Sequence, residues 1–191
     1  MLIVIAIVVR LRLGSPVLFR QMRPGLHERP FMLLKFRTMT DARDANGSLL
    51  PDAKRLLPFG CFLRRYSLDE LPQFFNVLRG DMSVVGPRPL LLKHLPYFTD
   101  AERVRFLVRP GITGLAQVAG RNTVSWDERF RLDIRYVETV NFRLDVTILL
   151  QTVRLLLARK GVVVDPESTM RNLDEERSAP LAASTTGGRD D

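Results

Sequence analysis

In the stretch Arg64-Arg65-Tyr66-Ser67-Leu68-Asp69-Glu70-Leu71-Pro72-Gln73, an adjacent Asp-Glu pair stands where a helix should begin. Arginines precede the pair, and another follows in Gly86-Pro87-Arg88-Pro89, where two prolines fix the backbone and hold Arg88 in one place. A guanidinium held in this way suits a planar, two-point contact with phosphate or a base edge, although pairing with Asp81 or another acid would also explain it. The layout predicts a site for phosphate groups.

The start of this helix admits two interpretations. Ser67 and Glu70 fit a capping box, which would leave Glu70 with a structural role alone. Alternatively Asp69 is the N-cap, and the proline that follows falls in the first turn, where its missing N–H costs little. In both cases the helix dipole favours an ionised Asp69 at neutral pH, and an ionised carboxylate needs no separate base to act as a nucleophile. The helix should extend from Leu68 to Leu78 and end at Gly80, with a core face formed by Leu71, Phe74, Phe75 and Leu78.

Composition limits the kinds of protein that this chain can be. Its 191 residues suit one domain, and 46% hydrophobic residues are enough for a core. The single cysteine, Cys61, rules out a disulfide framework within the chain, and together with the two histidines it forms no evident catalytic triad or zinc site. The formal charge of +8 favours anionic partners. We expect no nucleic acid among them, because the sequence has no reading motif and no aromatic–basic stacking platform.

The chain begins with a continuous apolar run, Leu2 to Val9, followed by Arg10 and Arg12. Eight helical residues extend roughly 12 Å, far short of the ~20 residues that a bilayer crossing needs. No basic segment precedes the run and no small-residue cleavage site follows it, so it does not match a signal peptide. Two interpretations remain, a buried core helix or strand and a short membrane anchor.

The rest of the pattern predicts an α+β fold that is mainly helical. Two short strands, Val17 to Met22 and Phe31 to Arg37, should form a β-hairpin through Pro24-Gly25. Capping boxes at Thr99-x-x-Glu102 and Ser125-x-x-Glu128 indicate helix starts, and the second makes the Asp-Glu pair at 127 and 128 structural. Helices are expected over residues 59–66, 90–97, 100–108, 125–140 and 145–160, and the polar tail 165–191 should be disordered. The helices at 90–97 and 100–108 fit a lipid interface as well as an ordinary protein surface.

Several motifs in order along the chain resemble one family, the bacterial sugar transferases or monotopic phosphoglycosyl transferases. The resemblance covers the chain from about Gly14 to about Val164. The motifs that carry it are Phe19-Arg20-Gln21-x-Arg23-x-Gly25, Lys35-Phe36-Arg37-Thr38-Met39, Leu68-Asp69-Glu70-Leu71-Pro72-Gln73, Gly80-Asp81-Met82-Ser83, Val85-Gly86-Pro87-Arg88-Pro89, Arg109-Pro110-Gly111-Ile112-Thr113-Gly114 and Gly120-Arg121-Asn122-x-x-Ser125-Trp126.

The resemblance implies a particular architecture and location. A small β-hairpin would pack with a catalytic helix and amphipathic membrane-interface helices in a catalytic domain over residues 14–164. A re-entrant membrane helix would precede it, of which residues 1–13 match only the outgoing leg. The protein would lie on the cytoplasmic face of the bacterial inner membrane, against an anionic membrane surface. A homodimer is also possible.

The resemblance also implies a reaction. Members of the family move a sugar-1-phosphate from a UDP-sugar to polyprenyl (undecaprenyl) phosphate and release UMP, which initiates the synthesis of a glycoconjugate. Asp69 would be the nucleophile, forming a covalent aspartyl phosphosugar, and also the ligand of Mg²⁺; Glu70 would assist. The residues expected to bind substrate are Arg64, Arg88, Lys35, Arg37, Arg109, Arg121 and Gln21. The alternative is a non-catalytic basic adaptor at the membrane surface, which would share the charge and the apolar segments.

Overall fold

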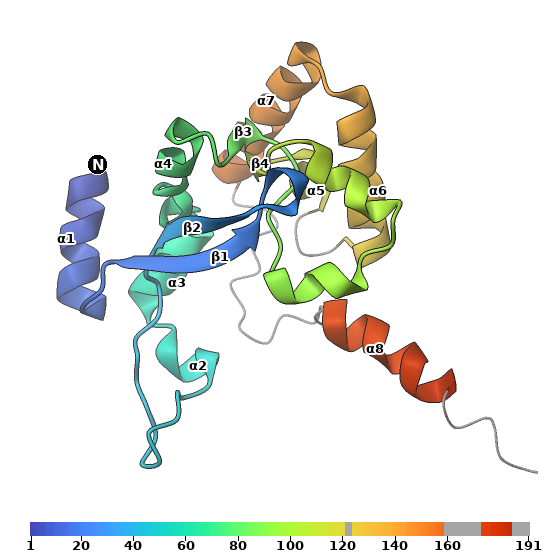
Figure 1. The fold of residues 1–191 in the computed structure, drawn as a ribbon. Coiled ribbons are helices and arrows are strands. Elements are labelled where there is room, and N and C mark those ends of the chain that lie inside the picture. The colour runs from blue at the N-terminus through green and yellow to red at the C-terminus, as the bar shows by residue number, and fades with distance from the viewer. Residues whose placement is uncertain (121–123, 159–172, 185–191) are drawn as a thin grey trace, which may run out of the picture.

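Helices make up most of the fold, and two small sheets lie among them (Figure 1). The computed structural model describes residues 1–120, 124–158 and 173–184. Its elements are α1 (Leu2–Leu13), β1 (Leu18–Pro24), η1 (Leu26–Glu28), β2 (Pro30–Phe36), α2 (Asp52–Arg55), α3 (Pro58–Arg65), η2 (Leu68–Glu70), α4 (Gln73–Leu78), β3 (Ser83–Val85), η3 (Leu92–Tyr97), η4 (Glu102–Leu107), β4 (Gly111–Thr113), α5 (Leu115–Gly120), α6 (Trp126–Thr139), α7 (Phe142–Ala158) and α8 (Leu173–Ser184). The prediction of a mainly helical α+β fold is confirmed.

The predicted hairpin is present. β1 and β2 pair antiparallel, from Leu18 opposite Phe36 to Pro24 opposite Pro30. Side chains alternate between the two faces of such a ribbon. One face therefore carries Lys35, which lies opposite Phe19, and the other carries residues from the next register positions along each strand.

Nearly all residues of helix α1 are apolar, but only one side of the helix packs against the protein. Val9 and Leu13 are buried against Phe36 of β2 and Leu63 of α3. The other side leaves apolar side chains exposed, namely Ile3, Val4, Ile7 and Leu11. The segment is thus a helix that is only half covered by the core. In the part of the chain that the structure describes, no helix has the length and apolar character to cross a bilayer.

The single helix expected over Leu68–Leu78 is wrong. The chain forms the 3₁₀ turn η2 and then the separate helix α4. Ser67, with φ 53°, adopts the left-handed conformation between α3 and η2, and its side chain makes no capping hydrogen bond. Neither expected cap forms, because this tight reversal places the acids in a turn before the helix begins. The expected end of the helix is confirmed, since α4 ends at Leu78 and Gly80 follows with φ 81°.

The expected core face of α4 is also wrong. Phe74, Phe75 and Leu78 are 46%, 48% and 83% exposed. The helix instead buries its polar residue Asn76, which accepts a hydrogen bond from the Leu34 N–H (3.1 Å) and donates one to the Met32 carbonyl (2.8 Å). The free edge of β2 needs backbone partners. Asn76 supplies them, and this contact turns the aromatic side of α4 outward.

A parallel pair of short strands, β3 and β4, holds the loop that contains Arg88. Ser83 lies opposite Gly111 and Val85 opposite Thr113. A Cβ atom on Gly111 would lie 2.1 Å from the backbone nitrogen of Gly86, so no side chain fits there. The sequence analysis did not predict this pair, because three-residue strands leave no clear period.

The C-terminal half packs around a cluster of aromatic residues. The predicted capping box of Thr99 and Glu102 forms, whereas at Ser125 only the hydrogen bond from the Glu128 N–H forms and the Glu128 side chain binds Arg131. The cluster comprises Leu90, Phe98, Phe106, Trp126, Phe130 and Leu173. Leu173 belongs to α8, which differs from the disorder predicted over residues 165–191, because a buried leucine and ion pairs fix this stretch. Two of the basic residues on η3 and η4, for which the sequence left a lipid interface and an ordinary protein surface open, are buried: His94 and Arg105.

Candidate active site

Glu70 joins three separate segments of the chain. Its Oε1 atom accepts a hydrogen bond from Nζ of Lys35 on β2 and from Nη2 of Arg88, each at 2.7 Å. Burial alone would raise the pKa of Glu70, but the nearby charges of Arg88 and Lys35 lower it below its usual value. Glu70 is therefore an ionised anchor for two cations. Both Lys35 and Arg88 were predicted from the sequence as substrate-binding residues.

Asp69, the neighbouring acid, has the opposite electrostatic character. Its side chain is 8% exposed, and burial raises the pKa of Asp69 to about 6. The charge of Glu70 acts in the same direction, while Lys35, Arg64 and Arg88 act against it. The sequence favoured a low pKa for Asp69 because a helix was expected to begin here, but the acid lies in a buried turn. Asp69 is still mostly ionised at pH 7, and a buried acid with a shifted pKa is typical of a functional site.

Arg64 and Arg88 are the predicted arginines that the fold brings to the acid pair. Nε of Arg64 donates a hydrogen bond to Oγ1 of Thr38 at 3.0 Å, and the charge of Arg64 acts to lower the pKa of Asp69. The side chain of Arg88 is 40% exposed although it binds Glu70. Arg88 can therefore hold its carboxylate partner and still present N–H groups to an anion from solvent.

Other predicted residues make different contacts. Arg37 binds the carbonyls of Ser15 and Met39 and pairs with Asp41, so its guanidinium serves the backbone. Nε of Arg109 donates to the Gly80 carbonyl at 2.7 Å, at the end of α4. Gln21 accepts a hydrogen bond from Arg23 at 2.7 Å. Arg121 lies outside the described residues.

The sequence analysis missed two arginines near Arg88. Burial and then the charge of Arg88 lower the pKa of Arg23 to about 10, and its buried Nε atom has no hydrogen-bond partner among the residues that the structure describes. The guanidinium of Arg129 lies 4.7 Å from the centre of the Trp126 ring, and burial and then Arg88 lower its pKa. Like charges gathered in this way favour an anionic ligand. Arg23 lies within one of the family motifs, whereas no local signal singled out Arg129.

The carboxylates present limit how a metal ion can be held. Among residues 1–120, 124–158 and 173–184, no three His, Cys, Asp or Glu side chains cluster as a metal site. Glu70 already pairs with two cations, so Asp69 is the acid of the pair that remains for a metal ion. Mg²⁺ is often bound through one or two carboxylates together with substrate phosphates. Asp69 therefore fits a Mg²⁺ ion that completes its coordination with phosphate oxygens.

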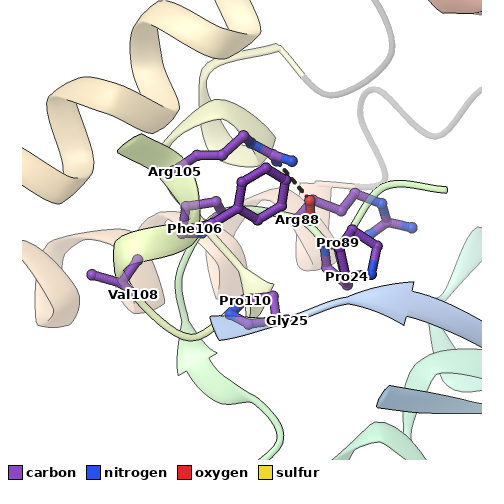
Figure 2. Close-up of a pocket in the computed structure, with 9 residues that line it drawn as sticks. Pro24, Gly25, Arg88, Pro89, Arg105, Phe106, Val108 and Pro110 are labelled. Atoms are coloured by element: carbon purple, nitrogen blue, oxygen red, sulfur yellow. Dashed lines mark hydrogen bonds between the residues drawn. The ribbon is translucent and has the colours of Figure 1, made fainter. Parts of the chain in front are cut away.

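Two hollows lie near these elements. One, under the Arg88 loop, measures about 10 Å³, room for about one water molecule, so no substrate fits inside it (Figure 2). The other is a groove of about 350 Å³ between the hairpin and α4, lined by Leu18, Arg20, Met32, Leu34, Phe75 and Arg79. The strand register places Arg20 and Leu34 on the face of the hairpin opposite Lys35. The groove is thus separate from the acid pair.

Comparison with known proteins shows which family this chain resembles. The family model described as "Bacterial sugar transferase" matches residues 1–159. The uncharacterized sugar transferase EpsL of Bacillus subtilis is 56% identical over 155 residues, which is 81% of this chain and 77% of that protein. A UDP-glucose:undecaprenyl-phosphate glucose-1-phosphate transferase of Caulobacter vibrioides is 42% identical over 168 residues, 82% of this chain and 62% of its own length.

An undecaprenyl-phosphate galactose phosphotransferase of Salmonella typhimurium is 38% identical over 165 residues, covering 78% of this chain and 35% of the relative. The chain thus spans about a third of that protein and most of the Bacillus one. The family match extends over most of the sequence and contains the acid pair, Lys35 and Arg88. The chain belongs to the bacterial sugar transferase family.

Proposed function

We propose that this protein transfers a sugar-1-phosphate from a UDP-sugar to polyprenyl (undecaprenyl) phosphate, releasing UMP and initiating a bacterial glycoconjugate. The names of the Salmonella and Caulobacter relatives support this reaction class. The observation that carries it is the acid pair, in which Glu70 holds two cations while Asp69 stays buried and mostly ionised beside them.

The reaction has to bring together a diphosphate and an acceptor phosphate, which repel each other. A covalent route separates them in time. In the first step a carboxylate oxygen of Asp69 bonds to the phosphorus attached to the sugar, and the bond from that phosphorus to the bridging oxygen breaks, so UMP leaves with the electron pair. In the second step an oxygen of the lipid phosphate bonds to the same phosphorus, and the carboxylate of Asp69 is released.

The cations around the acids have separate roles in this scheme. The exposed part of the Arg88 guanidinium binds the donor phosphates in a two-point contact, and Arg64 adds positive charge beside Asp69. Lys35 and Glu70 fix each other and so keep the charge near the reacting phosphorus constant. Mg²⁺ held by Asp69 and the diphosphate would neutralise charge that develops on the phosphate oxygens.

The acceptor is a lipid, so the protein must lie at a membrane surface. Exposed apolar side chains on α1 and α4 support such a placement. In Figure 1 α4 lies above the hairpin and α2 below it, while α1 stands beside the hairpin with its N-terminal end at the level of α4. The groove between the hairpin and α4 adds Arg20 and Arg79 to an apolar floor, and this combination suits anionic lipid headgroups. We place the protein on the cytoplasmic face of the bacterial inner membrane, where the UDP-sugar and Mg²⁺ are available.

Intact mass spectrometry tests the proposal. The protein is incubated with Mg²⁺ and single UDP-sugars in the absence of lipid. A mass gain of one sugar phosphate that Asp69→Asn abolishes is the expected result, and the sugar that gives it identifies the donor. A non-catalytic adaptor would gain no mass with any donor and would keep its membrane binding in the Asp69→Asn variant.

A further inference from the structure

Arg105 on η4 contacts the backbone of Arg88, whose side chain binds Glu70. Its Nη2 atom donates to the Arg88 carbonyl at 2.8 Å, the hydrogen bond drawn in Figure 2. Nε and Nη2 of the same guanidinium also donate to Oδ2 of Asp133 on α6, at 3.1 and 2.8 Å. The side chains of Arg105 and Asp133 are 2% and 3% exposed, so the whole arrangement is inside the protein.

Stability alone does not account for this buried ion pair. Removing two charges from water costs more than their attraction often returns, and well-packed apolar residues of similar volume commonly serve as well. The surroundings suit apolar residues, since the guanidinium lies 5.4–5.7 Å from the ring centres of Phe98, Phe106 and Phe130. An apolar residue cannot supply the N–H group that donates a hydrogen bond to the Arg88 carbonyl.

Other hydrogen bonds also hold the Arg88 loop, and one of them runs from Nη1 of Arg23 to the Pro89 carbonyl at 3.4 Å. The Gly86 N–H donates to the Thr113 carbonyl at 2.9 Å, and the Gly111 N–H donates to the Pro87 carbonyl at 3.0 Å. These bonds tie the residues before Arg88 to β4. At Arg88 itself, Arg105 holds the carbonyl while Glu70 holds the side chain. The small hollow beneath the loop leaves little room for the backbone to shift while Arg105 is in place.

We propose that Arg105, oriented by Asp133, is a positioning residue that fixes the backbone of Arg88 so that its guanidinium meets the donor diphosphate. The inference rests on the proposed function for the identity of that ligand. Arg105 itself touches no substrate. Its effect on the reaction passes entirely through Arg88, so the two residues should not act independently.

The test replaces the pair together, because Arg105→Met alone would leave Asp133 buried without a partner. The variant Arg105→Met/Asp133→Leu keeps the volume apolar. We expect it to fold and to form the phosphosugar adduct with a kcat/KM about 10- to 100-fold below wild type, since a misplaced binding group costs this much. In an Arg88→Ala background the same pair replacement should cause no further loss. Arg105→Lys, with Asp133 unchanged, should recover little of the lost kcat/KM, because a lysine does not reproduce the forked contact to both partners.

Arg177 provides a matched control. It also forms an ion pair, with Glu102 at 2.6 Å, lies 5.2 Å from the centre of the Phe130 ring, and donates to a backbone carbonyl at 2.6 Å. That carbonyl belongs to Tyr97 and not to Arg88. Arg177→Met/Glu102→Gln should therefore lower the melting temperature and leave kcat/KM unchanged.

Calorimetric titration with UDP gives a second measurement that needs no turnover. We expect the Arg105→Met/Asp133→Leu variant to bind UDP more weakly than the wild-type protein. In the Arg88→Ala background, proteins with and without the pair replacement should bind UDP equally. UDP binding that is the same in the wild-type protein and in the pair variant overturns the inference, as does a loss that persists in the Arg88→Ala background. If the wild-type protein binds UDP but forms no adduct with any UDP-sugar, the proposed function fails, and the UDP titration still decides the role of Arg105.

Discussion

Nζ of Lys35 lies 2.7 Å from Oε1 of Glu70, and this contact joins the hairpin to the turn that contains the acid pair. The same oxygen accepts the hydrogen bond from Arg88. Glu70 thus pairs with two cations, while burial raises the pKa of the neighbouring Asp69. The two adjacent acids lie in different electrostatic environments although their chemical type is the same.

Asp69→Asn should abolish formation of the phosphosugar adduct without unfolding the protein. The pKa of Asp69 is raised by burial from 3.8 to about 6, which corresponds to at most roughly 3 kcal/mol of unfavourable charge in the folded state at pH 7. A neutral side chain of the same shape relieves this cost. Thermal unfolding at pH 7 should give a melting temperature equal to or above that of wild type, and a marked decrease would contradict a purely chemical role for Asp69.

The rate of adduct formation should rise with pH through a midpoint near 6 and then level off, because only the ionised form of Asp69 attacks. The sign for stability is opposite: a carboxyl whose pKa is raised on folding makes the folded state bind more protons, so its contribution to stability falls as pH rises from 3.8 to about 6. Single-turnover rates between pH 5 and 8 measure the first effect.

The same rates distinguish the influence of Glu70 on Asp69. Glu70→Gln removes a negative charge that raises the pKa of Asp69 and leaves the opposing charges of Lys35 and Arg88 in place. The residual rate of this variant should therefore level off at a lower pH than that of wild type. A midpoint that stays where it is, or moves to higher pH, would show that Glu70 does not control the ionisation of Asp69.

Glu70→Gln should also lower the free energy of unfolding at pH 7, by about 1–3 kcal/mol, since it leaves Lys35 and Arg88 without their shared partner; the figure is kept low because Arg88 is partly exposed. The pKa of Glu70 is lowered on folding, so this difference should be complete above pH 4.5 and shrink as pH falls further. Urea unfolding of both proteins measures it. Glu128→Gln, which breaks an exposed ion pair with Arg131, is the matched control and should change nothing measurable.

Arg20→Ser/Arg79→Ser should weaken binding to vesicles that contain anionic phospholipid. Each basic side chain near such a surface contributes about 1 kcal/mol, so the pair should account for a loss of about 10- to 30-fold. Raising the salt concentration should reduce the difference between variant and wild type. Arg43→Ser/Lys54→Ser removes the same charge at two residues that do not line the groove, and serves as the control. Equal losses in the two variants would indicate general attraction in place of binding at the groove.

Features encoded by neighbouring residues could be predicted from the sequence. The hairpin follows from two apolar strands around Pro24-Gly25, and α4 ends where Gly80 permits a positive φ. The capping box at Thr99 and the N-cap hydrogen bond of Ser125 form because each needs only a residue three positions away. The capping box at Ser67 has the same spacing but does not form, since the packing of α3 against η2 imposes a left-handed turn.

Residue identity and order were enough to indicate the family, the acid pair and the cations drawn from several motifs. Which cation contacts which acid depends on the folding of distant segments against one another. Lys35, Glu70 and Arg88 come together across 35 and 18 positions of the chain, and the same packing buries Asp69 and raises its pKa. Burial and charge are summed over all neighbours in space, and no local pattern contains that sum.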